Sequence, residues 1–578
     1  MTNNIRVFLW LGLALALFLN YQQWQIDFGP KPTTNAATTA SGSATIPASP
    51  ADTVPQAAQS NPTSSPTDAI PTPAAPAAEV PSVAPAVEAQ TGGVVRVTTD
   101  VLVLEIDLKG GTLVRAELPG YPMVKGQPDP VVLFNRDSPS TAYVLQSGLT
   151  GAKPEGNYPN HLAEFSSAQE KYALASGQQE LRVPLTWTDD AGVTVTKTFV
   201  FQRGNFAVGL EYQVANAGTS PWVAHSYARI VRTDPEVERS MFKVESFSFR
   251  GPAFFGPKNP GDDNLYHKVP LDDAHKWKLP AGVVDGWIAG LQHHFVSAVV
   301  PDPKRKYDFS LGVNDRQFIL GVFEANGESV APGATAVIKE TVFVGPKLQR
   351  QLQALHPELD RVADYGILHL LSKPLFWLLD HAHSWVGNWG LAIILVTLLL
   401  KLAFYPLSEK AGRSMARMRA LAPRMKALQE TYKDDRAKLG QATMELYRAE
   451  KVNPLAGCLP MLIQMPVFLA FYWVLLESVE MRQAPFFGWI NDLSARDPFF
   501  ILPALNGLAM WAQYKLNPPP PDPMQAKIFQ FMPIVFSVMF ALFPAGLVLY
   551  WVTNTGLSIA QQWNINRRIA AEDKARKK

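Results

Sequence analysis

The chain has 578 residues, which is long enough for two or more domains. Its net charge is only +2 and charged residues make up 18% of it, so overall charge gives no argument for binding a specific nucleic-acid sequence. Cys458 is the only cysteine, which excludes an internal disulfide and a multi-cysteine metal site. The histidines show no H-E-x-x-H spacing, and the phosphate-binding pattern G-x-x-x-x-G-K-[ST] does not occur. We therefore expect no metal and no cofactor.

The first 28 residues predict a membrane anchor that the mature chain retains. An apolar run at residues 5–19 is followed by Trp24, which suits a membrane interface, and not by the small residues of a cleavage site. A cleaved signal peptide is the alternative. Residues 29–91 are mostly Pro, Ala, Ser and Thr. Such a composition cannot bury apolar surface, so it predicts a disordered linker.

Residues 92–346 predict an antiparallel β-sandwich. Short segments with apolar residues at every second position, such as Val193–Phe201 and Ala207–Val214, alternate with turn signals such as Lys109–Gly111. A linker and a helix follow in residues 347–386. The helix, at Tyr365–His383, is too short and too polar to cross a bilayer, so we interpret it as an amphipathic helix on the membrane surface. An ordinary packing helix of the soluble domain is the alternative.

Residues 387–563 predict an α-helical membrane bundle of five spans, which the anchor brings to six. Three are continuous apolar segments, at residues 391–407, 454–476 and 499–516. The stretch 528–560 is too long for one span, because about 20 residues suffice. It contains the turn signal Phe543–Gly546, which predicts two short helices in a hairpin.

Loop charges orient these spans. Residues 408–453 carry a large excess of Lys and Arg, whereas residues 477–498 carry few. By the positive-inside rule the first loop is cytoplasmic and the second is not. The basic tail, residues 564–578, also belongs in the cytoplasm, and six spans place it there. The sandwich then lies in the periplasm of an inner-membrane protein.

The basic loop predicts two helices, residues 409–422 and 424–449, that meet at Pro423. Flexible methionines suit a surface that accepts varied apolar partners, and basic charge attracts anionic lipid. A solvated hairpin with a few core methionines is the alternative. The candidate contact residues of this cytoplasmic hairpin are Met415, Arg417, Met418, Arg424 and Met425.

Lys401 is the sharpest single signal. It lies about 15 Å from Leu391 along a helix, hence near the middle of a hydrocarbon core about 30 Å thick. A charge there costs on the order of 3 kcal/mol, so it faces either a wet pocket or, by snorkelling, the cytoplasmic interface. No span contains Asp or Glu, but polar residues occur in several: Thr397, Gln464, Thr553, Asn554, Thr555 and Ser558. They predict a polar pocket around Lys401, interhelical hydrogen bonding being the alternative.

Several sequence blocks carry a family resemblance. In the helical part they are Val386–Gly390, Asn453–Leu455, Leu462–Pro466, Arg482–Phe486 and Phe543–Trp551. In the β-sandwich they are Gln146–Gly151 and Phe249–Gly251. The blocks follow one another in order over nearly the whole chain outside the linker. Together they closely resemble the YidC membrane protein insertases of Gram-negative bacteria.

The resemblance implies a protein that inserts and folds inner-membrane proteins, alone or beside the Sec translocon, through a hydrophilic groove. The family's positive residue that recruits a client's acidic tail matches Lys401; many members carry arginine there, and lysine lacks its planar fork of donors. The groove is expected to be lined by Thr397, Lys401, Gln464, Tyr550, Trp551 and Asn554. The implied partners are nascent inner-membrane proteins, the translocon with its accessory subunits, membrane lipids, and the ribosome at the basic tail and loops. The sandwich is similar to the sugar-mutarotase fold, a β-supersandwich, but fold does not imply activity.

Two other function classes are alternatives. A secondary transporter predicts inverted repeats, and the sequence shows no internal repeat. A tethered carbohydrate enzyme needs a convergent acid/base pair; His267, Asp272, Asp273 and His275 are close in sequence, but in a predicted loop. An insertase explains the basic loop, the polar pocket and the spans together. We therefore expect no enzyme, and insertion driven by hydrophobic partitioning and the membrane potential.

Overall fold

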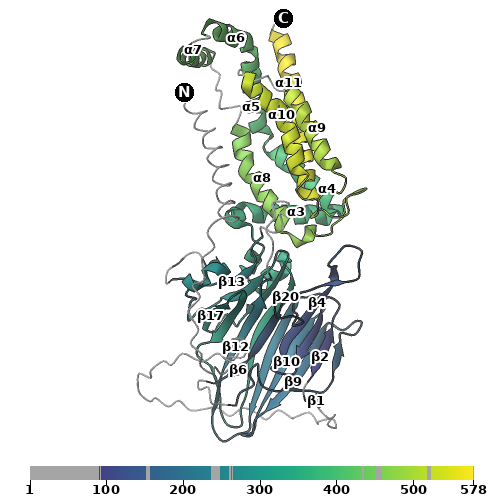
Figure 1. Ribbon diagram of the computed structural model, residues 1–578, viewed down its shortest axis with the longest axis vertical. Helices are drawn as coiled ribbons and strands as arrows, with labels where there is room; N and C mark the ends of the chain where they lie inside the picture. Colours follow the sequence, from purple (N-terminus) through teal and green to yellow (C-terminus); the bar gives the residue numbers. More distant parts are fainter. Residues whose placement is uncertain are drawn as a thin grey trace, which may run out of the picture.

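A computed structural model gives the structure of the chain, which consists of a β-domain and a helical bundle stacked end to end (Figure 1). It describes residues 90–91, 93–151, 157–235, 248–259, 262, 265–432, 435–450, 459–516 and 523–576. The predicted anchor and nearly all of the predicted linker lie outside these residues.

Two sheets build the β-domain, which confirms the predicted antiparallel β-sandwich. The first has the order β1 (Gln90–Thr91), β7 (Ser166–Ser167), β9 (Glu180–Thr188), β10 (Val193–Gln202), β11 (Ala207–Asn216), β20 (Thr335–Pro346), β16 (Phe295–Val300), β15 (Trp287–Leu291), β13 (Gly251–Phe255) and β14 (Tyr266–Lys268). The second has the order β17 (Tyr307–Asn314), β18 (Gln317–Glu324), β12 (Trp222–Thr233), β6 (Tyr143–Thr150), β4 (Thr112–Pro122), β3 (Val103–Asp107), β2 (Val94–Thr98) and β8 (Lys171–Ala173), with β19 (Glu328–Val330) beside β12 and β5 (Pro130–Val132) beside β4. The described pairs are antiparallel except β2 with β8.

Alternation along each strand sets the register. In β9 every second side chain is buried, and its Trp187 lies opposite Val195 of β10. Because a one-residue slip would turn these side chains to the solvent, the core between the sheets fixes the pairing. A single apolar cluster fills that space.

Charged groups are also enclosed in the sandwich. Lys197 of β10 is fully buried, and its Nζ donates to the carbonyls of Gly110, Gly111 and Ser147, at 3.0, 2.9 and 2.9 Å. Burial lowers the pKa of Lys197 to about 7 and raises that of Glu340 on β20 to about 7, because in both cases it disfavours the charged form. The lysine therefore bridges the two sheets.

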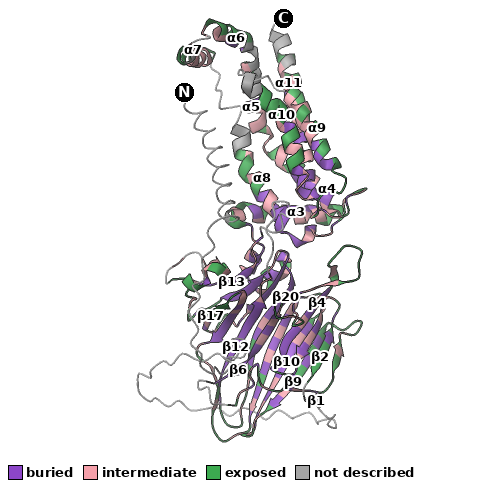
Figure 2. Cartoon of the chain, in the orientation of Figure 1, coloured by how far each residue is buried: buried purple, intermediate pink, exposed green. Residues whose placement is uncertain are grey.

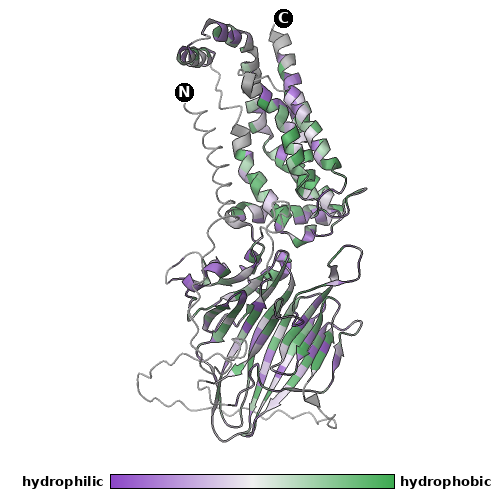
Figure 3. Cartoon of the chain, viewed as in Figure 1, coloured by the Kyte–Doolittle hydropathy of each residue, from purple (hydrophilic) through white to green (hydrophobic). Residues whose placement is uncertain are grey.

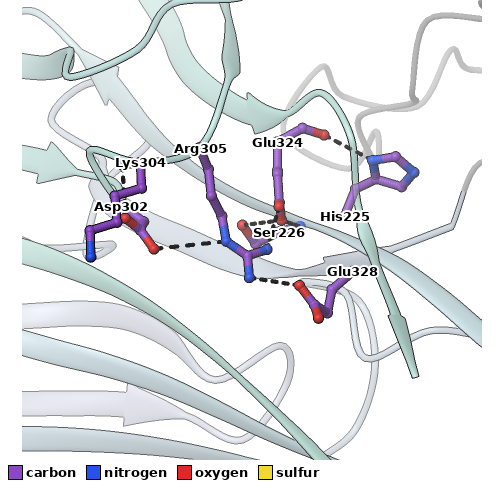
Figure 4. A network of polar contacts seen from close by, with 7 residues as sticks. All are labelled: His225, Ser226, Asp302, Lys304, Arg305, Glu324 and Glu328. Carbon is purple, nitrogen blue, oxygen red and sulfur yellow. Dashed lines mark hydrogen bonds and ion pairs between the residues drawn. The ribbon is translucent and has the colours of Figure 1, made fainter. Parts of the chain in front are cut away.

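Arg305 joins three carboxylates at one end of the second sheet (Figure 4). Its guanidinium donates to Glu324 of β18 and, at 2.6 Å, to Glu328 of β19, and it lies 3.8 Å from Asp302. The Nδ1 atom of His225 contacts the carbonyl of Glu324 at 2.8 Å. These carboxylates are occupied by the arginine, so the network supports the fold and offers no free general base.

The described helices are η3 (Leu271–Lys276), α2 (Gln349–Leu355), η4 (Leu359–Val362), η5 (Gly366–Leu368), α3 (His369–Val386), α4 (Trp389–Ala403), α5 (Tyr405–Ala420), α6 (Ala422–Thr431), α7 (Arg436–Ala449), α8 (Leu459–Glu477), η7 (Val479–Met481), α9 (Ile501–Leu516), α10 (Pro523–Phe540) and α11 (Ala545–Arg576). In the bundle, α11 packs against α4 and α9, and α3 packs against α4 and α8. Buried residues concentrate where the bundle faces the β-domain, and exposure increases toward α6 and α7 (Figure 2).

Prolines end helices earlier than predicted. The expected continuous span 391–407 is wrong, because α4 ends at Ala403 and α5 continues at 60° to it. Pro406 has no N–H for the Leu402 carbonyl and would clash with it in a straight helix, so it stands in the first turn of a new one. Lys401 consequently lies in the last turn of α4, and its depth in a membrane stays a prediction. The hairpin likewise breaks at Leu421 and not at Pro423, which lies in the first turn of α6.

The last helix is longer than predicted. The break at the turn signal is confirmed, since α10 ends at Phe540 and α11 begins at Ala545. However, α11 is not short: it runs to Arg576 and includes most of the predicted tail. No glycine or proline follows Gly556, so nothing in the sequence ends this helix.

Helix α3 begins at His369, one turn after the predicted start. It buries Leu375, Phe376 and Leu379 against the helical bundle, whereas the alternative was a packing helix of the soluble domain. The other face exposes 59% of Trp377 and 77% of Trp385. Its place on a membrane surface stays a prediction.

Among the described residues, no helix alone has both the length and the apolar composition to cross a bilayer, although the bent pair α4 and α5 passes the test as a unit. Ile463–Glu477 and Lys527–Phe540 are shorter apolar segments.

Buried polar contacts join the β-domain to the bundle. Ser248 Oγ donates to Glu477 at the end of α8 at 2.7 Å, and the His293 ring lies 3.1 Å from the carbonyl of Leu476. Burial, followed by the nearby Lys347, lowers the pKa of His293 to about 3, so this imidazole is neutral at ordinary pH. The junction is thus a hydrogen-bonded interface without a charged histidine.

Candidate functional site

Lys401 projects from α4 toward α11. Its Nζ donates to Ser558 Oγ at 2.8 Å, and Ser558 in turn donates to the carbonyl of Asn554 at 2.7 Å. Within the described part of the chain, no ion pair joins Lys401 to a carboxylate. An ammonium group has three donors, so it retains capacity for an acidic partner.

Gln464 of α8 reaches the same turn of α11. Its Nε2 atom donates to Asn554 Oδ1 at 2.9 Å, and both side chains are partly buried. Asn554 and Ser558 are four residues apart and therefore lie on one helix face. Three helices thus bring Lys401, Gln464, Asn554 and Ser558 together, and we call these four residues the polar cluster.

An aromatic layer lies one turn earlier on α11, on the side of the β-domain. Trp551 packs edge-on against Phe468 at 4.3 Å and lies 4.9 Å from Phe540. Tyr550 is buried, with its ring 4.9 Å from that of Phe471. Tyr550 and Trp551 therefore belong to an apolar layer next to the polar cluster and contribute no polar contact to it in the described structure.

Thr397, which was predicted to line the groove, makes no described contact with the polar cluster. Its side chain is buried, and its hydroxyl donates to the Ile393 carbonyl at 2.6 Å. Asn506 of α9, which the sequence did not single out, accepts from Thr555 at 3.4 Å. For Thr555 and Asn506, hydrogen bonding between helices therefore describes the contact better than a polar pocket around Lys401. A lone asparagine in an apolar helix was the available signal for Asn506.

The predicted hairpin residues occupy different environments. Arg417 and Arg424 are exposed, and Arg424 pairs with Glu450 of α7. Met418 is half-buried, and the side chain of Met415 lies outside the described residues. Met425 is buried, and its sulfur accepts from Thr443 at 3.6 Å, so it packs between α6 and α7.

The first hairpin helix is held against α11. Asn564 donates to the Tyr405 hydroxyl at 3.3 Å, and Arg413 forms a two-pronged contact with Glu572 at 3.1 and 3.2 Å. A Cβ on Gly412 would lie 2.8 Å from Ile565, so glycine permits the close approach of α5 and α11. On the hairpin side of the polar cluster, α5 is therefore packed against α11.

The acid/base candidates of the β-domain, such as His267 and Asp273, make other contacts than an acid/base pair. The His267 ring packs against Phe254 and Trp277, at 5.0 and 5.8 Å, and Asp273 pairs with Lys276. In the described ranges, no group of three or more His, Cys, Asp or Glu side chains could hold a metal ion. The polar cluster offers ammonium, amide and hydroxyl groups that can bind and orient charged or polar groups.

Two family models match the chain. The model described as the 60Kd inner membrane protein matches residues 381–573, and the YidC periplasmic domain matches residues 94–378. Among curated relatives, the membrane protein insertase YidC of Thioalkalivibrio sulfidiphilus is 46% identical over 100% of both chains. That of Methylococcus capsulatus is 42% identical over 98% of both.

Solved structures give weaker likenesses. An active YidC insertase crystal structure has a TM-score of 0.35 at 18% identity and covers 80% of this chain and 90% of its own. A putative aldose 1-epimerase from Escherichia coli K12 has a TM-score of 0.27 at 11% identity, over 44% and 99%. Both TM-scores are below 0.5, so the assignment rests on the sequence matches over the full length. The chain belongs to the YidC membrane protein insertase family.

Proposed function

We propose that the protein inserts and folds inner-membrane proteins, and that the polar cluster is where a client's hydrophilic segment enters the membrane. The observation that carries this proposal is Lys401, an ammonium group at the end of an apolar helix whose described contacts leave donors free. Its position in the last turn of α4 is also favourable, because the helix dipole stabilises a cation there. An acidic client tail is the complementary ligand.

The surrounding groups support transient binding. Gln464 and Asn554 offer amide donors and acceptors, which can exchange their mutual hydrogen bond for bonds to a passing backbone. The aromatic layer at Tyr550 and Trp551 closes the cluster toward the β-domain. A client tail would therefore enter from the hairpin side, while its apolar segment moves into the lipid.

The proposal includes a topology of six spans, with the β-domain in the periplasm and the end of α11 in the cytoplasm. It rests on the excess of basic residues in the hairpin and at the end of α11, as the positive-inside rule requires. The match of residues 94–378 to the YidC periplasmic domain supports the proposed side of the β-domain. Moving a client across the bilayer makes and breaks no covalent bond, so the protein is not an enzyme and partitioning with the membrane potential supplies the driving force.

The same proposal assigns partners to the exposed basic surfaces. We infer ribosome contacts at the end of α11, lipid contacts along the bundle, and operation both with and without the Sec translocon. Arg567 and Arg568 lie on the last turns of α11, with the Arg567 guanidinium 5.7 Å from the Trp563 ring centroid. Such basic surfaces suit an anionic partner.

Depletion with complementation tests the function. Cells depleted of the protein should fail to translocate the acidic N-terminal tail of a small single-span client, so that external protease no longer cuts the tail. Expression of the full chain should restore cleavage. A client whose cleavage is unchanged on depletion, under conditions where the protein is undetectable, would contradict the insertase proposal.

A further inference from the structure

The loop after β4 presents two adjacent apolar side chains to the solvent. Met123 and Val124 are 64% and 55% exposed. Figure 1 shows this loop rising from β4 toward the helical bundle, on the side of the β-domain nearest to it. Single exposed apolar residues are ordinary on a protein surface, so the position of this pair decides its meaning.

Hydrogen bonds fix the loop to the segment between α8 and α9. Arg482 and Gln483 both donate to the Pro122 carbonyl, at 2.7 and 2.9 Å. Lys125 Nζ donates back to the carbonyl of Gln483 at 2.8 Å. Hydrogen bonds between side chains and backbone carbonyls therefore hold the loop on both sides of its apolar pair, which stays exposed.

An aromatic base supports this position. The Tyr121 ring packs edge-on against Phe295 and against Phe206, with centroids 5.9 and 6.2 Å apart. The Arg482 guanidinium lies 5.5 Å from the Phe295 centroid. The root of the loop is thus part of the junction between the β-domain and the bundle.

The segment between α8 and α9 exposes aromatic side chains at the same junction. Phe487, Phe499 and Phe500 are 57%, 66% and 53% exposed. Asp497 accepts from the backbone N–H groups of Phe499 and Leu502, at 3.0 and 2.7 Å, which holds this turn before α9. Phe500 has a φ of 57°, a costly conformation for a bulky residue that the turn imposes.

We propose that Met123, Val124, Phe487, Phe499 and Phe500 form one lipid-binding rim that inserts into the periplasmic leaflet at the level of the phospholipid headgroups. This inference rests on the proposed placement of the bundle in the membrane. Apolar side chains on a rigid loop gain by leaving water for the interface. The outer surfaces of α9 and α10 continue the rim with exposed Leu508 and Ile534. Inserted in this way, the loop fixes the orientation of the β-domain relative to the bilayer.

Site-specific fluorescence quenching tests the rim. The sole cysteine is replaced by Cys458→Ser, and Val124→Cys or Phe487→Cys carries an environment-sensitive fluorophore in the full chain. The protein is placed in phosphatidylethanolamine and phosphatidylglycerol vesicles that contain nitroxide-labelled lipid. Quenching at both positions should exceed that at Val337→Cys by at least about threefold, because only interfacial side chains lie within reach of the lipid. Val337 is 48% exposed and lies near the end of β20 that is remote from the bundle.

Ile534→Cys distinguishes failure of the lipid-binding rim from failure of the proposed placement of the bundle in the membrane. This position on α10 is 62% exposed and should be quenched if the bundle lies in the membrane at all. Loss of quenching there would contradict the proposed function. Strong quenching at Ile534→Cys, with Val124→Cys no different from Val337→Cys, would overturn the rim alone. Shielding of Val124→Cys in native membranes but not in vesicles would assign a protein partner and would equally overturn the lipid rim.

Discussion

The β-domain and the helical bundle differ in how hydropathy runs along the chain: hydrophobic and hydrophilic residues alternate along the strands, whereas hydrophobic residues dominate the helices of the bundle near the β-domain (Figure 3). The sandwich encloses its apolar residues between two sheets. The bundle instead exposes apolar residues on its outside, such as Val538 at 67% and Leu508 at 62%, while Lys401 and Gln464 make contacts between helices. The bundle thus has a buried apolar core of its own and, in addition, an exposed apolar surface, as expected of helices that face lipid. The difference supports the proposed placement of the bundle in the bilayer.

Two lysines show the same contrast at single residues. Lys197 in the sandwich uses its three donors on three carbonyls. Lys401 in the bundle is only half-buried and has one described hydrogen bond, to Ser558. The first lysine has a structural role that is complete in the folded chain. The second retains donors, which a binding site requires.

Charge reversal at Lys401 is the strongest way to test that contrast. Lys401→Glu should reduce insertion of clients with acidic tails by about tenfold, which corresponds to about 1.4 kcal/mol, because attraction becomes repulsion. Lys401→Arg should retain most activity. The measurement is protease protection of the client tail after depletion of the wild-type protein. Lys410→Glu, at an exposed position on α5, is the matched control, and equal losses at both sites would show a general effect of charge.

Substitution of the buried Glu340 tests how burial of charged groups inside the β-domain affects its stability. Burial raises its pKa to about 7 from 4.5. Between those values the unfolded chain loses the proton while the folded chain keeps it, so this group makes the domain less stable as pH rises from about 4.5 to 7, and its effect levels off above that. Glu340→Gln should remove the trend, a difference on the order of 3 kcal/mol between the two ends.

Limited proteolysis of the full chain in detergent measures that trend. The readout is the rate of cleavage within residues 180–216. The difference between wild type and Glu340→Gln should grow from pH 5 to pH 8. Glu170→Gln, at an exposed position, should leave the pH profile unchanged. Parallel profiles for wild type and Glu340→Gln would contradict burial of an acid in this interior.

Alanine substitutions at two glycines compare a packed and an open position of the bundle. A Cβ on Gly390 would lie 2.0 Å from the Phe486 ring, whereas one on Gly556 would meet no atom within 4 Å. Gly390→Ala should therefore destabilise the start of α4 by about 1–3 kcal/mol through overpacking. Gly556→Ala should stabilise α11 by about 0.5–1 kcal/mol, because alanine favours a helix. Thermal unfolding in detergent compares them, and equal shifts of the same sign would contradict the described packing.

Removal of the Arg413 contact should have the smallest effect. This arginine pairs with Glu409 and Glu572, and all three groups are accessible to water. Arg413→Ala should weaken the α5–α11 association only slightly, and the loss should vanish at high salt. Hydrogen exchange in α5 peptides at low and high salt measures it. A large effect that persists in 1 M salt would show that the contact is buried in the membrane-bound protein.

Periodicity and turn chemistry predicted the larger features correctly. Alternation in β9 and β10 requires a buried face, and Pro544 interrupts a helix, so the sandwich and the break before α11 were both predictable. Helix ends were less so. The bend after Ala403 depends on Pro406 and on where α5 docks against α11, and that docking joins residues far apart in the sequence.

The candidate site was predictable in its members but not in their pairing. Lys401, Gln464 and Asn554 were identified as polar residues in apolar surroundings. Their contacts depend on the rotation of three helices, which no local pattern specifies. For the same reason Thr397, one turn from Lys401, was expected beside it but bonds its own backbone, and Ser558 proved to be the direct partner of the lysine.

Photo-crosslinking of an arrested client tests the central claim most directly. A photoreactive amino acid replaces Gln464 or Ser558 in the polar cluster, or Ile534 on the exposed face of α10, and ribosome-bound chains of a single-span client are irradiated. The account predicts adducts with the client's hydrophilic tail at 464 and 558, and none with that tail at 534. Equal tail adducts at all three positions, or adducts at 534 alone, would contradict entry through the polar cluster.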